Sequence, residues 1–110
     1  MLNAAHYVRD IEGYIVNPYD WDSSLAKQMA AEEGLELTQE YWPILQFMRD
    51  YWMDHHIIPD VRHVVEYLVS AQHYDKKSAK QHLFQLFPYG YVKQACKIAG
   101  MQRPRAWSTG

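Results

Sequence analysis

The chain has 110 residues, which is enough for one hydrophobic core and too few for two domains. An apolar content of 48%, an aromatic content of 15% and a formal net charge of only -2 exclude an intrinsically disordered protein. No apolar run approaches the ~20 residues that cross a bilayer, and the first residues show no signal-peptide pattern, so we expect a cytoplasmic protein.

The first predicted elements are extended. Residues 6–9 and 13–16 are rich in tyrosine, valine and isoleucine, which favour strands, and mainly polar residues separate them. This pattern predicts a small N-terminal β-hairpin or meander. A turn at residues 17–20 should follow it, because asparagine, proline and aspartate occur there together.

Helical spacing of apolar residues governs the chain from there to Gly100. Side chains that can cap a helix N-terminus precede the first three predicted helices: Asp20 or Asp22, Thr38 and Asp60. Pro43 predicts a delayed start or a bend in the second helix. The predicted helices are residues 21–33, a second from Thr38 to the break at 57–59, a third from Asp60 to the polar residues 73–75, then 77–87 and 91–99.

Together these elements predict an α+β fold, in which a small β-hairpin or meander packs on an array of about five helices. Residues 1–100 would form a single domain. Residues 101–110 have no pattern that sustains a helix, and we predict that they form a flexible C-terminal arm.

Charge is divided along the chain. All thirteen acidic residues lie between Asp10 and Asp75, whereas seven of the eleven basic residues follow Asp75. The seven are Lys76, Lys77, Lys80, Lys93, Lys97, Arg103 and Arg105. A basic third of this kind can attract an anionic partner, or it can simply pack on the acidic remainder. The sequence leaves both interpretations open.

Cys96 is the single cysteine, so neither an internal disulfide nor a zinc site made of thiolates can form, in keeping with a reducing compartment. Lys93 and Lys97 could lower its pKa, and the thiolate could then attack a persulfide or disulfide of a partner. However, Cys96 shares helical spacing with three small apolar residues, and it lies near the predicted helix C-terminus. Those features favour a buried and inert thiol.

The sequence contains no motif for a metal site, a phosphate-binding loop or a serine hydrolase. The histidines match neither the HExxH pattern nor a zinc ribbon, and the adjacent His55 and His56 cannot share one helical face. No glycine-rich phosphate loop and no GxSxG motif occurs. We therefore expect no metal and no cofactor.

A nucleic-acid function is an alternative. Residues 60–67 and 77–87 could form a helix-turn-helix pair with the second helix as the reader. The low pI of about 6.3 and the scarcity of base-reading side chains on that helix argue against it.

Residues 86–100, with the sequence LFPYGYVKQACKIAG, resemble the DsrC/TusE family of sulfur-relay proteins, which includes the gamma subunit of dissimilatory sulfite reductase. The similarity extends upstream through residues 12–14, Trp21, and residues 31–35, 41–42 and 47–51. The resemblance implies a β-meander packed on helices and an arm that docks into a partner. It also implies transfer of sulfur as persulfide, toward thiolation of the tRNA wobble uridine or in exchange with sulfite reductase.

One position departs from the family pattern. Members with two cysteines carry one that matches Cys96 and a penultimate one eleven residues later, where this chain has Trp107. A disulfide or trisulfide between two arm cysteines is therefore impossible here. The resemblance leaves Cys96 as the persulfide site and implies the following partner-binding residues: Lys93, Lys97, Arg103, Arg105 and Trp107.

We therefore expect a sulfur-relay protein, a persulfide carrier related to sulfurtransferases. It would dock its arm into a sulfurtransferase or a sulfite-reductase-type partner and would reach tRNA only through a thiolation enzyme. Whether it turns over as an enzyme stays open. The alternative is a noncatalytic regulatory or scaffold member of the family, with DNA binding through the helix-turn-helix-like pair as a further option.

Overall fold

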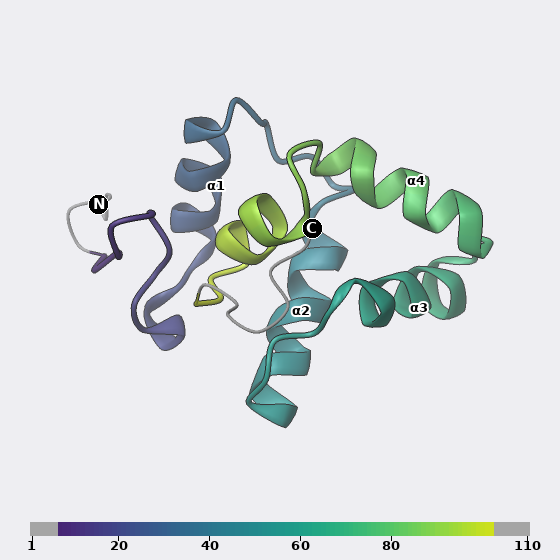
Figure 1. Cartoon of the computed structure of the whole chain (residues 1–110), viewed down its shortest axis with the longest axis horizontal. Helices are drawn as coiled ribbons and strands as arrows, with labels where there is room; N and C mark the ends of the chain where they lie inside the picture. Colours follow the sequence, from purple (N-terminus) through teal and green to yellow (C-terminus); the bar gives the residue numbers. More distant parts are fainter. Residues whose placement is uncertain (1–6, 103–110) are drawn as a thin grey trace.

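The computed structural model describes residues 7–102, which form an array of helices (Figure 1). The α3 and α4 helices lie side by side at one end, α1 lies at the other, and the last helix, η3, lies between α1 and α2. None of the helices in this part of the chain is long and apolar enough to cross a membrane. The elements are the 3-10 turn η2 Pro18–Asp20, α1 Ser23–Glu32, α2 Trp42–His55, α3 Val61–Gln72, α4 Lys76–Leu86 and the π-helix η3 Tyr91–Cys96.

The predicted N-terminal β-hairpin or meander is wrong, and with it the α+β class. Residues 7–102 contain no sheet, and a single antiparallel bridge joins Arg9 to Ile15. The Asp10 carboxylate accepts hydrogen bonds from the backbone N–H groups of Glu12 and Tyr14, which closes a tight turn. This local satisfaction of the backbone leaves no length for a strand ladder, so the segment packs on the helices as a turn.

Side-chain caps explain where the helices begin. The carboxylates of Asp22 and Asp75 accept from the backbone N–H groups of Leu25 and Ser78. Asp60 forms a capping box with His63. The cap predicted at Asp60 is thus confirmed, and of the two alternatives Asp20 and Asp22 it is Asp22 that caps α1. Such predictions succeed because capping depends on residues only a few positions apart.

The second helix begins later than Thr38. Tyr41 is its N-cap, without a side-chain hydrogen bond, and Pro43 lies in the first turn, where a missing N–H costs nothing. Thr38 instead accepts from the N–H of Glu40 through its hydroxyl and from that of Tyr41 through its carbonyl. The delayed start predicted from Pro43 is confirmed.

The C-terminal segment lies at the centre of the core. Five of the six residues of η3 are buried. The hydroxyl of Tyr14 donates to the carbonyl of Val92, and the hydroxyl of Tyr41 donates to that of Leu86. Met101, the first residue of the predicted arm, is also fully buried. The segment that carries Cys96 is therefore enclosed by the helices that precede it.

Candidate functional site

Cys96 is a free thiol with no exposed surface. It is the last residue of η3, and its carbonyl accepts from the Met101 N–H in the turn that ends the helix at Gly100. Burial raises the pKa of the thiol to about 12, against a usual value of 9.0, and the neighbouring Tyr91 hydroxyl offsets only part of this rise. The site therefore disfavours the thiolate that sulfur transfer needs.

Tyr91 lies next to the Cys96 thiol in the core. Its hydroxyl donates to the carbonyl of Pro59, which precedes α3, and the Tyr91 ring is almost completely buried. Desolvation raises the pKa of Tyr91 strongly, and the neighbouring Cys96 contributes to this rise. A neutral phenol beside a neutral thiol is an arrangement typical of a packed core.

The two lysines next to Cys96 in sequence do not activate it. Lys97 extends toward α1, where its Nζ lies 3.8 Å from Oε2 of Glu33 and 5.1 Å from the ring centre of Tyr14. Lys93 is exposed. Neither lysine contributes to the pKa of Cys96. The structure therefore separates the predicted nucleophile from the predicted activating cations.

Lys93 and Lys97 instead share a hollow of about 370 Å³ at the junction of η3 with α1 and the N-terminal turn. Its lining combines both charges and two phenol rings: Glu12, Tyr14, Glu33, Tyr89, Lys93 and Lys97. Glu33 also accepts a hydrogen bond from Gln94. Because carboxylates balance the lysines, the hollow is a mixed surface rather than an anion site, and Cys96 does not line it.

Where the chain leaves the domain, the side chains of Trp21 and Arg49 hold its backbone in a clamp. The Trp21 indole N–H donates to the carbonyl of Ile98 at 2.8 Å. Arg49 donates to the carbonyls of Ala99 and Gly100, each at 3.3 Å, and to that of Pro18 at 2.9 Å. Three successive carbonyls at a helix end, which would otherwise lack partners, are thus satisfied by two side chains.

Arg49 is buried, and among residues 7–102 no carboxylate forms an ion pair with it. Desolvation lowers the pKa of its guanidinium, whose central carbon lies 4.5 Å from the centre of the Trp21 ring. Carbonyl dipoles and the indole face therefore take the place of a counter-charge. An arginine within an apolar helical stripe was the available sequence signal for this clamp.

Gly100 is necessary at the clamp. Its φ of +78° lies in the region that glycine tolerates best, and an added Cβ would come within 2.2 Å of the Trp21 ring and 2.8 Å of Arg49. The clamp thus determines the direction in which the chain continues. Arg103, Arg105 and Trp107, the remaining predicted site residues, lie outside the described residues, and their roles stay predictions.

Comparison with known proteins shows the family to which this chain belongs. Residues 1–106 match the family model described as DsrC like protein. The chain belongs to the DsrC-like family. It is 34% identical over 103 residues to the sulfurtransferase TusE of Sodalis glossinidius, with 94% of each chain covered. It is 38% identical over 96 residues to that of Yersinia pseudotuberculosis, which covers 86% of this chain and 87% of the relative.

Solved structures agree. The NMR structure of Allochromatium vinosum DsrC matches with a TM-score of 0.79 and 38% identity, covering 92% of this chain and 89% of that one. The resemblance to the DsrC/TusE family is therefore confirmed. In this member of the DsrC-like family, the cysteine within the KQACKIAG segment is buried in the core.

Proposed function

We propose that this DsrC-like chain takes part in a sulfur relay as a docking or regulatory protein and does not carry persulfide on Cys96 in its folded state. Family membership and the sulfurtransferase relatives support the relay. The complete burial of Cys96 supports the noncatalytic role, because an incoming persulfide needs access to the sulfur. With the pKa raised from 9.0 to about 12, ionising the thiol in place would cost about 4 kcal/mol more than in water.

Intact-mass spectrometry after incubation with a persulfide donor tests this proposal. Native protein should gain no sulfur, while protein unfolded in urea should react fully at its single cysteine. The Cys96→Ser variant supplies the blank in both conditions. A stoichiometric adduct on native wild-type protein that is absent from Cys96→Ser would instead establish persulfide carriage.

The partner in this proposal is a sulfurtransferase or a sulfite-reductase-type protein, engaged by the arm with Arg103, Arg105 and Trp107. Lys93 is exposed beside the arm-bearing segment, whereas Lys97 is engaged with Glu33. We therefore expect Lys93→Glu to weaken binding of such a partner more than Lys97→Gln. Surface plasmon resonance at two salt concentrations would measure this, since contacts between exposed charges weaken as salt rises. Equal binding by Lys93→Glu and wild type would remove Lys93 from the interface.

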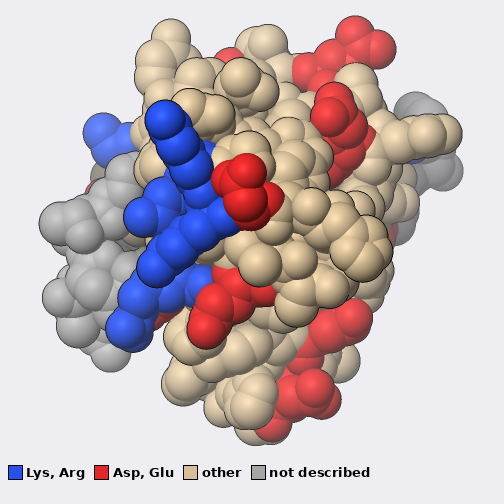
Figure 2. Space-filling model, turned by 90° about the vertical axis from the view of Figure 1, so that its right-hand side faces the viewer, with Lys and Arg blue, Asp and Glu red and all other residues tan. Residues whose placement is uncertain are grey.

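A second candidate function is nucleic-acid binding by α3 and α4. Figure 2 looks onto the end of the molecule where these helices meet, and shows basic side chains gathered in a continuous stripe. On α4, Lys76, Lys77 and Lys80 are exposed, and none of them forms an ion pair with any described residue. Titration against duplex DNA at low and high salt tests this candidate. Phosphate contacts must weaken with salt, and lack of binding at low salt would exclude them.

A further inference from the structure

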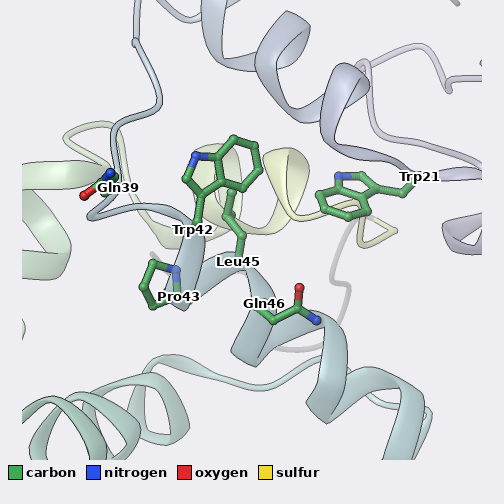
Figure 3. A pocket seen from close by; sticks show the side chains of 6 residues that line it. All are labelled: Trp21, Gln39, Trp42, Pro43, Leu45 and Gln46. Carbon is green, nitrogen blue, oxygen red and sulfur yellow. The ribbon is translucent and has the colours of Figure 1, made fainter.

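An apolar groove of about 380 Å³ lies between Trp21 and the first turns of α2 (Figure 3). The indoles of Trp21 and Trp42 flank it, and the Leu45 side chain lies between them. Its full lining is Trp21, Gln39, Trp42, Pro43, Leu45 and Gln46. The groove contains no cysteine and no lysine, so it is separate from both regions described above.

The groove lies where the chain leaves the domain. Trp21 lines it and also holds the carbonyl of Ile98, while Gly100 packs directly on the Trp21 ring. Beyond the clamp, the side chain of Gln102 donates to the carbonyl of Val16 at 2.7 Å. The chain therefore passes Trp21, one wall of the groove, just before residue 103. Met101 is buried and Gln102 is held on Val16, so the reach is counted from Gln102. Five residue steps lead from Gln102 to Trp107, and they span about 17 Å when extended.

The chemistry of that segment matches the groove. Trp107 provides an apolar ring of the kind that packs on indole and proline surfaces, and Gln39 and Gln46 provide amide oxygens that can accept from its N–H. Asp50 lies one turn beyond Gln46, is exposed, and accepts a hydrogen bond from the Gln46 amide at 2.8 Å. Its carboxylate is thus adjacent to Gln46, which lines the groove, and it suits the arginines that precede Trp107 in the chain.

We propose that this groove is the docking site for residues 103–110 of the same chain, with the Trp107 indole seated between Trp21 and Trp42. In the docked state Arg103 or Arg105 pairs with Asp50. A docked arm is withheld from any partner, so release of Trp107 precedes partner binding. The docking itself does not require that the chain serve a sulfur relay, and its test involves no sulfur chemistry.

The chain contains four tryptophans, so the indole N–H region of a ¹H–¹⁵N spectrum reports on each one. In Trp107→Ala one signal disappears, and we expect the Trp42 signal to shift. Trp52, which packs against Tyr19 and His56, serves as the internal control and should not move. In wild type the Trp107 indole should be as rigid as the domain by heteronuclear NOE. A mobile Trp107 indole with an unchanged Trp42 signal in Trp107→Ala would overturn the proposal.

A substitution on the groove rim provides a second measurement in a protein that keeps the whole arm. Gln46 is exposed, so Gln46→Arg should fold normally, occupy Asp50 and repel the arm arginines. We expect it to release Trp107, raising the mobility of its indole, whereas the matched Gln46→Glu should keep Trp107 rigid. Equal mobility in both variants would contradict the proposed charge contact.

Dilution separates docking in cis from docking onto a second copy. If the arm docks on its own domain, the Trp42 and Trp107 signals stay constant over a hundredfold dilution. Signals that move toward those of Trp107→Ala on dilution would show that the groove takes the arm of another molecule, and would overturn docking within one chain.

Discussion

The helices η3 and α4 both bear lysines, yet they belong to opposite environments. In η3 five of six residues are buried, its nucleophile has no exposed surface, and Lys97 next to it is engaged by Glu33. In α4 only Ala79, Leu83 and Leu86 are buried, and its lysines are exposed. The type of a residue therefore indicates which chemistry or binding it could support. Its burial and its neighbours decide whether that chemistry or binding can occur.

The largest expected effect tests how firmly the C-terminal region is enclosed. Gly100→Ala should destabilise the protein by roughly 3 kcal/mol or more, because it combines a φ of +78° with a clash against Trp21. Gly34→Ala is the matched control, since its φ of +76° is similar but no atom lies within 4 Å of the added Cβ. It should cost only about 1 kcal/mol. Urea unfolding measures both, and equal losses would show that the Trp21 contact yields without cost.

Arg49→Met should come next, with a loss of roughly 2–3 kcal/mol, because the buried carbonyls of Ala99, Gly100 and Pro18 lose their donors. Arg49→Lys should recover little, since an ammonium cannot reproduce the planar set of donors. Arg62→Met is the control, because the Arg62 side chain is 85% exposed and should contribute within about 0.5 kcal/mol. Full recovery by lysine in urea unfolding would count against the clamp geometry.

A smaller effect depends on pH. The Cys96 pKa is about 12 in the folded protein against 9.0 for an ordinary thiol, so the unfolded chain loses this proton first as pH rises. The stability contribution is complete below pH 9 and declines between pH 9 and 12. Between pH 8 and 10, wild type should lose about 1.4 kcal/mol more than Cys96→Ala. Parallel pH profiles of the two proteins in urea unfolding would mean that the thiol is not desolvated.

The smallest effect is expected in α4. Replacing Lys76, Lys77 and Lys80 together by glutamine should change the free energy of unfolding by less than about 0.5 kcal/mol, because these side chains are exposed and make no ion pair with described residues. Thermal unfolding measures this change. A fall of more than 1 kcal/mol in the free energy of unfolding would show that the lysines stabilise the fold and are not simply exposed side chains available to a ligand.

The sequence was most informative where structure depends on near neighbours. Asp22 and Asp60 cap the helices as expected, and Pro43 delays α2, because each effect involves residues within one turn. The prediction of an N-terminal hairpin was wrong because a sheet depends on more than near neighbours. Strand propensity at residues 6–9 and 13–16 needs a longer ladder to become a sheet, and the Asp10 turn competed successfully with it.

At the candidate site, the sequence placed Cys96 beside two lysines and left its reactivity undecided. Successive residues on a helix point in different directions, so Lys97 extends toward Glu33 while Cys96 faces Tyr91. Which of these directions is sealed depends on the segments packed around η3. Local spacing could not show this, although the apolar spacing around Cys96 favoured burial.

By itself the sequence determined the approximate positions of the helices, the cap at Asp60, the family and the lone cysteine, since all of these depend on local patterns. The tertiary structure alone decided that the thiol is buried and that Trp21 and Arg49 hold the carbonyls of residues 98–100. Those contacts join residues 50 to 77 positions apart. Burial and long-range hydrogen bonding arise only when distant segments pack together, and that packing determines what the chemistry of Cys96 can be.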